Sequence, residues 1–482
     1  MQVVRYERRR VVVLKHLGSA HNADELAAMV DGARLWIARS SAQHALFEAQ
    51  PRRTLALATT QYMGATHALA YQVLHKAAQR CGLDALGDEL LLDLAIMRLV
   101  APGSKLRAIE HLKEFFGRHH AERTVYRSLR RMVEHKDPLE RIAVGYARDR
   151  LHASLNMVLY DVTTLYFESF RSDELRTPGF SKDGKPQQPQ IVLGLLVTTE
   201  GFPLGYEVFT GNTFEGKTML PVVRSFMARH QVQDLAVVAD AAMLSQNLLE
   251  VLRKESIHYI VGARLANAPP TLIERVSQTL DQRDGAIVRV PSKHGDMVCQ
   301  FSPKRYKKDH AIMQQQLAKA QTLVARGEPG RRAKFVSHNK SDKGYAIDQA
   351  LLRKTTRLLG IKGYCTSIPE EKLSNEGVIA RYHDLWHVEK AFRIAKSDLA
   401  TRPIFHHSQQ SIHAHMAICF AALIMARSIE LATSASLRQV VDALWKVTDA
   451  TLLDSTTNEI ITLRAPIPDP TKAFISALSV SY

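Results

Sequence analysis

The stretch NMVLYDVTTLYF, residues 156–167, decides the fold class of this chain. Its β-branched and aromatic residues are typical of a strand. The segment PQIVLGLLVTTEGFPLGYEVFTG, residues 189–211, has two apolar runs around the turn TTEGFP and predicts a hairpin of two further strands. Helix and strand patterns then alternate along TMLPVVRSFMARH (218–230), DLAVVAD (234–240), SQNLLEVLRKES (245–256) and HYIVGARL (258–265). This order of elements predicts an α/β fold with five strands.

The regions around this core differ from it in composition. Residues 1–145 read as a mostly helical N-terminal region that we expect to bind DNA. The first part of the core spans 146–265, and a charged insert follows at 266–370. The second part, 371–435, holds the apolar run MAICFAALIMA, which is shorter than the ~20 residues that cross a bilayer. We therefore expect a buried helix, no membrane partner, and a C-terminal tail at 436–482 that is a candidate for dimerisation.

The chain is strongly basic. Its 482 residues include 64 Lys and Arg against 48 Asp and Glu, which gives a net charge of +16. Such a surplus indicates a polyanionic partner, usually nucleic acid, although a basic enzyme without such a partner has the same composition. The four cysteines form no C-x-x-C pair, which argues against a zinc knuckle and a disulfide framework. These features fit a reducing cytoplasm.

The third helix expected in the N-terminal region, ERTVYRSLRRMVEH (122–135), is densely basic. Three short helices that end in a basic one are typical of a helix-turn-helix DNA reader. A helical bundle with a solvated basic face gives the same pattern, and the sequence leaves both interpretations open. The candidate DNA contacts on this helix are Arg123, Arg127, Arg130 and Arg131.

Two aspartates follow apolar strand segments. Asp161 comes after MVLY and Asp240 after LAVVA, so we expect each at the end of a strand. A buried carboxylate is costly unless it is paired or binds metal, although either residue alone is more often a turn residue or a helix cap. Together with Glu389 they would form an all-oxygen set that fits hard cations such as Mg²⁺. Two such ions ~3.5–4 Å apart can activate a water and stabilise the leaving oxygen of a phosphodiester.

Glu389 belongs to the segment RYHDLWHVEKAFRIAKSDL, residues 381–399. Tyr382, Glu389 and Lys396 follow one another at intervals of seven residues, close to two helical turns, so a helix would place them on one face. Arg393 lies between the last two. An amphipathic helix with spaced charges on its solvated face gives the same pattern.

These residues resemble the RNase H-like core of DDE transposases. YHDLWHVEKAFRIAK is similar to the Tyr-x2-Arg-x3-Glu-x6-Lys signature of a large group of bacterial insertion-sequence transposases. YDVTTLYFES, GFSKDGKPQQPQIVLGLLV and EVFTGNTFEGKT also resemble the core of that group, and the resemblance covers about residues 90–430. One departure is Leu385, which stands where the signature has arginine. Its effect would be a weaker hold on DNA without loss of the metal site.

The resemblance implies an RNase H-like mixed five-stranded sheet with flanking helices, interrupted by an inserted subdomain. It implies that Asp161, Asp240 and Glu389 are catalytic and hold two Mg²⁺ ions, which Mn²⁺ can replace. Tyr382 and Lys396 would lie against DNA, with Arg393 beside them. The implied activity is cut-and-paste transposition: cleavage at transposon ends and strand transfer into target DNA.

The partners implied are equally specific. They are the terminal inverted repeats of transposon-end DNA, target DNA, and a second copy of the chain in the DNA complex. We expect a cytoplasmic protein that joins the nucleoid when it is bound to DNA, and no nucleotide cofactor.

A rival motif predicts another class of enzyme. GNTFEGKT, residues 211–218, satisfies the Walker A pattern and suggests a P-loop ATPase acting on nucleic acid. Three features oppose this interpretation. The loop has only the two obligatory glycines, Glu215 would bring a negative charge into a phosphate cradle, and the preceding strand is the return arm of a hairpin. A third class, a non-catalytic DNA-binding regulator, would have no use for converging acids.

Overall fold

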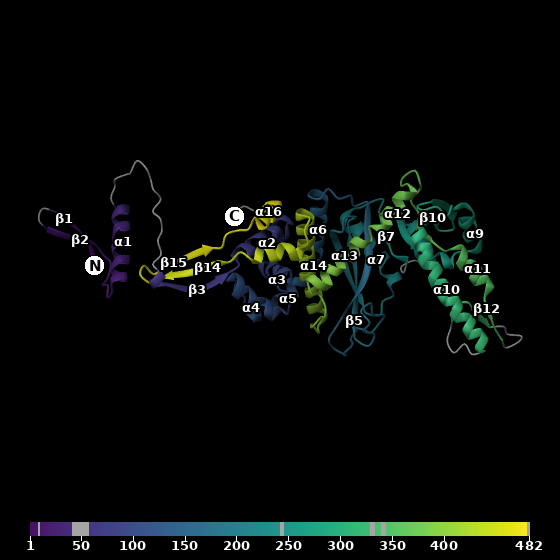
Figure 1. The fold of residues 1–482 in the computed structure, drawn as a ribbon, viewed down its shortest axis with the longest axis horizontal. Coiled ribbons are helices and arrows are strands. Elements are labelled where there is room, and N and C mark those ends of the chain that lie inside the picture. Colours follow the sequence, from purple (N-terminus) through teal and green to yellow (C-terminus); the bar gives the residue numbers. More distant parts are fainter. Residues whose placement is uncertain (8–9, 41–56, 242–244, 328–332, 339–343, 480–482) are drawn as a thin grey trace. The chain divides into compact units, whose positions relative to one another are not determined.

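The computed structural model describes residues 1–7, 10–40, 57–241, 245–327, 333–338 and 344–479 (Figure 1). The contacts divide the chain into two compact units. The first unit consists of residues 1–76, 109–120 and 438–482, and the second of residues 77–108 and 121–437. The two ends of the chain thus contribute to the same unit, and the break at residue 437 lies close to the expected start of the C-terminal tail at 436.

The second unit is built on one mixed sheet with the strand order β6-β5-β4-β7-β8-β13-β10-β9. Three strands form an antiparallel meander: β4 (Met157–Tyr166), β5 (Gln190–Val197) and β6 (Pro203–Thr210). The strands β7 (Ala236–Ala239) and β8 (His258–Ala263) follow on the other side of β4, both parallel to it. Apolar, β-branched residues fill these strands, and most of them are buried. This mixed sheet with flanking helices fits an RNase H-like core.

The sheet is wider than predicted. We expected five strands, but the insert adds three antiparallel strands beyond β8: β13 (Ile361–Thr366), β10 (Gly295–Phe301) and β9 (Ile287–Ser292). The edge of β8 would otherwise leave unpaired backbone N–H and C=O groups, and β13 satisfies them by pairing Gly363 with Ala263. The inserted residues are therefore continuous with the core sheet.

The rest of the insert forms a small layer of its own. Its helices are α9 (Pro270–Thr279), α10 (Pro303–Arg326) and α11 (Gln349–Arg357), and its short strands are β11 (Val336–His338) and β12 (Tyr345–Ile347). Four buried side chains hold this layer together: Met313, Ala320, Phe335 and Leu359.

The core sheet is joined and covered by helices. α7 (Met219–His230) connects β6 to β7, and α8 (Gln246–Lys254) connects β7 to β8. The predicted buried helix is confirmed as α14 (Gln409–Thr433), which packs against β6 and against α3 (Glu89–Val100), α5 (Glu122–Met132) and α6 (Lys136–Asp149). By length and composition α14 is the one helix in the described part of the chain that could cross a membrane, but 83% of its apolar window is buried inside the protein.

The first unit contains strands that the sequence analysis missed. β1 (Gln2–Glu7) and β2 (Arg10–His16) pair as an antiparallel hairpin, followed by α1 (Ala23–Ser40). A second sheet has the order β15-β14-β3, in which β3 (Thr60–Thr66) pairs with β14 (Asp449–Asp454), and β14 with β15 (Glu459–Arg464). The unit also holds α15 (Leu437–Trp445) and α16 (Asp469–Ala477), and the ring of Trp445 stacks on His67 at 3.8 Å. The C-terminal tail is thus part of a folded unit.

Candidate active site

Asp161 and Asp240 lie side by side on neighbouring strands. The parallel pairing of β4 with β7 aligns Tyr160 with Ala239, and each of the two aspartates is the next residue along its strand. Asp240 follows the end of β7, as predicted. Asp161 does not end its strand: it is the fifth residue of β4, which continues to Tyr166 because β5 keeps pairing with it beyond β7. Asp161 and Asp240 therefore meet at the C-terminal end of β7, the shorter of the two strands, while β4 continues past it.

A lysine and a third carboxylate stand beside Asp161. Lys182 Nζ lies 3.9 Å from Asp161 Oδ1 and 3.0 Å from Glu215 Oε1, and it donates a hydrogen bond to the carbonyl of Val162. Burial raises the pKa of Asp161 to about 6, and the charges of Glu215 and Asp240 push it in the same direction. Lys182 and the backbone N–H of Val162 oppose this shift. The site is thus a partly buried cluster of carboxylates with one ammonium as a counter-charge.

Tyr382 reaches this cluster from a helix. Its hydroxyl donates a hydrogen bond of 2.9 Å to Oδ1 of Asp240, and its ring is buried. Burial, followed by the charge of Asp240, raises the pKa of the phenol. Gly262 on β8 makes room for it, since a Cβ there would lie 2.5 Å from the Tyr382 hydroxyl. In this structure Tyr382 therefore supports an acid of the site.

The helix predicted over residues 381–399 is divided into three parts. α12 (Asn375–His383) carries Tyr382 in its last turn, a turn at Asp384 and Leu385 follows, and α13 (Trp386–Arg393) carries Glu389. The last part is a π-helical turn, η7 (Ile394–Asp398), which holds Lys396. Asp384 and Leu385 in the turn keep right-handed helical backbone angles, and only the last part, which holds Lys396, has the wider π-helical winding. Leu385 itself is buried and presents no charge to solvent.

Glu389 is exposed on α13, a helix that packs against β4 and β5. Val388 and Phe392 are buried and anchor that helix. The charge of Glu389 also contributes to the raised pKa of Tyr382, which places the carboxylate within electrostatic reach of the phenol that binds Asp240.

The donor chemistry of this edge fits a divalent cation in part. Asp161 and Asp240 are adjacent oxygen donors whose mutual repulsion a cation would relieve. In the part of the chain that the structure describes, no group of three or more His, Cys, Asp or Glu side chains is close enough to hold an ion. The strand register thus brings the two aspartates together, and the role of Glu389 as a third ligand stays a prediction.

Lys396 makes an ion pair instead of facing solvent. Its Nζ lies 3.4 Å from Oδ1 of Asp183, which also binds Arg402. The side chains of Lys396 and Asp183 are only 12% and 13% exposed, and burial lowers the pKa of the lysine. Asp183 directly follows Lys182, so one loop contacts both the acid cluster and the signature lysine. The predicted DNA contact Arg393 is exposed on α13.

The basic third helix is α5, and its arginines differ in their contacts. Arg123, Arg127 and Arg130 are exposed. Arg131 is exposed as well, and it pairs with the buried Asp88 at 3.2 Å. Asp88 in turn accepts a hydrogen bond from the backbone N–H of Leu91 at the start of α3. Arg131 thus has a structural contact that the sequence did not reveal. Tyr126, 49% exposed between the arginines, adds an aromatic ring to their face.

The Walker-like segment does not form a phosphate loop. The strand before it, β6, is an edge strand that pairs antiparallel with β5, whereas a P-loop follows a strand inside a parallel sheet. Glu215 lies in a 3₁₀ turn, η4 (Glu215–Lys217), and its carboxylate pairs with Lys182. The interpretation as a P-loop ATPase is therefore wrong, and the glutamate that argued against it belongs to the acid cluster.

Sequence reasoning missed three members of this site: Lys182, Asp183 and Glu215. All lie in segments noted for their resemblance or for the rival motif, GFSKDGKP and GNTFEGKT, but neither segment showed where its charges would point. The sequence feature that could have indicated them is a run of charged residues and glycine between two strongly apolar strands. An ordinary surface turn has the same composition.

Comparison with known proteins identifies the family of the chain through one family model. The family model described as "Transposase DDE domain" matches residues 155–425, more than half of the chain. No curated protein matches. Among solved structures, a piggyBac transposase synaptic complex with hairpin DNA is 10% identical, with 86% of this chain and 70% of that chain covered and a TM-score of 0.36. A Mos1 transposase paired-end complex with left transposon end is 13% identical, with 48% and 66% covered and a TM-score of 0.17. These structural likenesses are too low to support an argument about residues.

Proposed function

Because the chain belongs to the transposase DDE-domain family and is a DNA transposase, we propose that its chemistry takes place where β4 and β7 bring Asp161 beside Asp240. That placement is the observation that carries the assignment. A partly buried carboxylate whose pKa is raised to about 6 beside other acids is unfavourable for folding alone, and perturbed groups of this kind are typical of functional sites. A DNA-binding regulator without catalytic activity would not need this pair of adjacent carboxylates.

We assign Asp161, Asp240 and Glu389 as the residues that hold two divalent ions, Mg²⁺ or Mn²⁺. Proteins of this family generally use divalent metals, which lower the pKa of an attacking water and stabilise the leaving oxygen of a phosphodiester. Glu389 completes the set from α13, which already packs on β4. Tyr382 fixes the orientation of Asp240, and Lys182 offsets part of the negative charge beside Asp161.

The DNA contacts follow from the exposed basic groups. Arg123, Arg127 and Arg130 on α5, with the ring of Tyr126 among them, form a face that suits a phosphate backbone. Arg393, which is exposed, lies on the segment that carries Glu389 and would hold the cleaved end. Lys396 on the same segment would join it once DNA replaces its ion pair with Asp183. Arg131 remains a candidate DNA contact, since its side chain is 60% exposed although it also pairs with Asp88.

The larger reaction is the cut-and-paste movement of an insertion sequence. Cleavage at terminal inverted repeats would expose a 3′-hydroxyl, which then attacks target DNA at the same site. Holding two ends together requires two copies of the chain, so we propose a homodimer in the DNA complex. The protein would act in the cytoplasm, on the nucleoid.

The decisive experiment compares cleavage with binding. Asp161→Asn, Asp240→Asn and Glu389→Gln preserve size and remove charge, so each should bind end DNA in a gel shift as wild type does. Each should lose Mg²⁺- or Mn²⁺-dependent cleavage by several orders of magnitude. Glu168→Gln, an exposed carboxylate paired with Lys185, is the matched control and should cleave normally. Near wild-type cleavage by Asp161→Asn or Asp240→Asn would refute the proposed active site. Near wild-type cleavage by Glu389→Gln alone would refute Glu389 as the third metal ligand.

A further inference from the structure

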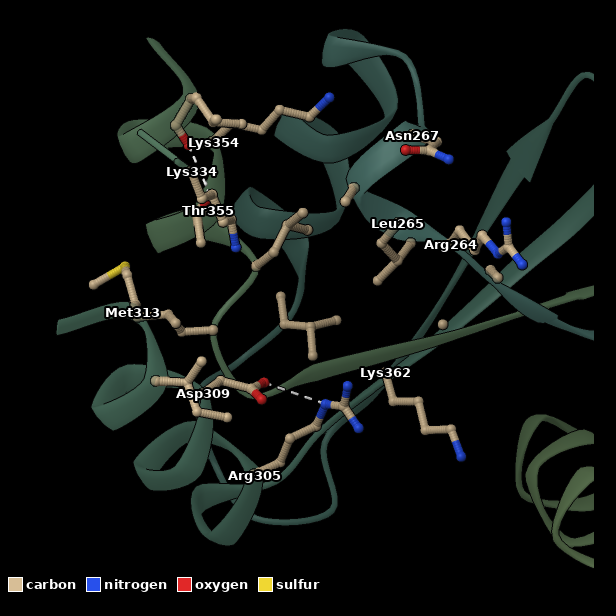
Figure 2. A pocket seen from close by; sticks show the side chains of 18 of the residues that line it. Arg264, Leu265, Asn267, Arg305, Asp309, Met313, Lys334, Lys354, Thr355 and Lys362 are labelled. Carbon is tan, nitrogen blue, oxygen red and sulfur yellow. Dashed lines mark hydrogen bonds and ion pairs between the residues drawn. The ribbon is translucent and has the colours of Figure 1, made fainter. Parts of the chain in front are cut away.

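A second charged site lies in the inserted layer. A cavity of about 510 Å³ opens among the end of β8, α10, α11 and β13 (Figure 2). Apolar side chains line its floor, among them Leu265, Met313 and Leu359. Five basic side chains surround it, each from a different segment of the chain: Arg264, Arg305, Lys334, Lys354 and Lys362.

The cavity has a strong excess of positive charge. Asp309 is the one carboxylate among its described lining residues, and it pairs with Arg305 at 3.3 Å. The other four basic side chains form no ion pair with any residue in the described part of the chain. Like charges gathered around an apolar floor repel one another, and an anion would relieve that repulsion. Burial and the charge of Arg305 lower the pKa of Lys362, which is the direction that such repulsion produces.

The cavity is connected to the acid cluster through two side chains. Lys362 Nζ lies 4.7 Å from the centre of the Tyr382 ring, and the Tyr382 hydroxyl binds Asp240. Arg264 follows Ala263, the last residue of β8, two positions after the Gly262 that accommodates Tyr382. A chain of phosphates bound along the basic side chains would therefore lead to the edge of the sheet where Asp240 lies.

We propose that this cavity binds the phosphodiester backbone of the DNA strand that enters the active site. The inference rests on the proposed function, because it supplies the path to a site placed at Asp161 and Asp240. The basic groups come from five segments spread around the cavity, which suits successive phosphates of a strand better than one small anion. Asn267 and Thr355 add uncharged hydrogen-bonding groups of the kind that contact phosphates and sugars.

The test measures how DNA binding depends on salt. The double variant Arg264→Ala/Lys354→Ala removes two charges from the cavity. Lys308→Ala/Lys319→Ala, on the exposed surface of α10 and outside the cavity, removes the same charge as a matched control. The probe is a fluorescent duplex carrying one end of the element, with EDTA present to prevent cleavage. The cavity variant should reduce the slope of log K against log salt by about two units, and the control should keep the wild-type slope.

Two further arms separate the possible outcomes. Inorganic phosphate and ATP are added to the wild type and to the cavity variant, and their melting temperatures are compared. Stabilisation of the wild type alone, with equal salt slopes for both proteins, would make the cavity a small-anion site and overturn the proposal. Equal slopes without any stabilisation would overturn it as well.

The same panel includes Asp161→Asn, which should bind with the wild-type slope and fail to cleave. If it fails to cleave while the cavity variant binds normally, the inferred path is wrong and the active site stands. If Asp161→Asn cleaves normally, the proposed active site is wrong whatever the cavity variant does.

Discussion

Tyr382 and Asp240, 142 residues apart in sequence, are joined by a hydrogen bond of 2.9 Å from the phenol to the carboxylate. The bond ties the end of α12 to the end of β7, at the position where Asp240 lies beside Asp161. The resemblance suggested Tyr382 as a DNA contact, but its hydroxyl donates a hydrogen bond to the carboxylate of Asp240. A side chain that hydrogen-bonds to a metal-binding residue orients that residue, and its loss typically costs ~10–100-fold in metal affinity or activity.

Tyr382→Phe should therefore reduce metal-dependent cleavage about 10–100-fold and raise the Mg²⁺ concentration needed for half-maximal rate. DNA affinity should change little, because the hydroxyl faces Asp240. Tyr364→Phe is the control, since this neighbouring buried phenol contacts His383 rather than a carboxylate. Gly262→Ala should reproduce the defect by displacing the Tyr382 hydroxyl. A Tyr382→Phe protein with lowered DNA affinity and unchanged metal dependence would instead make the tyrosine a DNA contact.

Lys182→Met should move the acid limb of the cleavage pH profile upward by about one unit. In wild type the pKa of Asp161 is raised to about 6 and Lys182 opposes that rise, so loss of the lysine raises it further. Metal binding needs the ionised carboxylate, and the ionised fraction near neutral pH would then fall. Lys185→Met, in the same loop but paired with Glu168, should leave the profile in place. An unshifted limb in Lys182→Met would show that the ammonium does not act on Asp161.

Asp183→Asn should lower the melting temperature of the free protein. The change leaves Lys396 and Arg402 facing each other without the carboxylate that binds both. If phosphates of end DNA take the place of Asp183, DNA should raise the melting temperature of the variant more than that of the wild type. Thermal melts with and without end DNA measure both effects. The same DNA-induced rise in both proteins would mean that Lys396 stays away from DNA.

Arg127→Ala/Arg130→Ala should reduce the salt slope of DNA binding by about two units, because each lost phosphate contact removes close to one. Arg224→Ala/Arg283→Ala is matched in charge, and both of its arginines already pair with carboxylates, Glu255 and Asp281. It should keep the wild-type slope. Equal slopes for the two double variants would leave α5 as a bundle helix with a solvated face.

Lys105→Met should remove a pH dependence of stability. Lys105 is buried with its Nζ 2.5 Å from His406 Nε2, and burial, followed by the charge of Arg98, lowers its pKa to about 7. Above that pH the folded chain has lost a proton that the unfolded chain keeps up to its ordinary lysine pKa. This one group therefore makes the unfolding free energy rise with pH, by up to about 1.4 kcal/mol per unit.

Chemical denaturation between about pH 7 and pH 9 should show this increment in the wild type and not in Lys105→Met. At pH values below the folded pKa, the variant should be the more stable protein, because it avoids a buried charge. Lys113→Met, an exposed lysine of α4 (Lys105–Phe116), should keep the wild-type pH dependence. Identical pH dependence in all three proteins would place the Lys105 proton outside this window.

Local patterns in the sequence determined much of the fold. Apolar, β-branched runs identified all five strands from β4 to β8, because their composition is a property of each segment alone. The run around Met416–Ala426 identified α14 as buried. The transposase family also followed from short motifs, and the family match confirms it. The roles of Asp161, Asp240 and Glu389 remain predictions that the cleavage experiment tests.

The tertiary structure decided which charged groups meet. Lys182 and Glu215 join Asp161, and Asp183 joins Lys396 across 213 residues, although Lys182, Asp183 and Glu215 have the sequence context of an ordinary surface turn. The same holds for the edge of β8, where three strands of the insert extend the sheet, and for β3 and β14, which pair from opposite ends of the chain. Periodicity reports which side of its own element a residue occupies, whereas the partner across a sheet or a loop is set by chain topology. Ion pairs and strand pairs between distant segments therefore leave no local pattern to read.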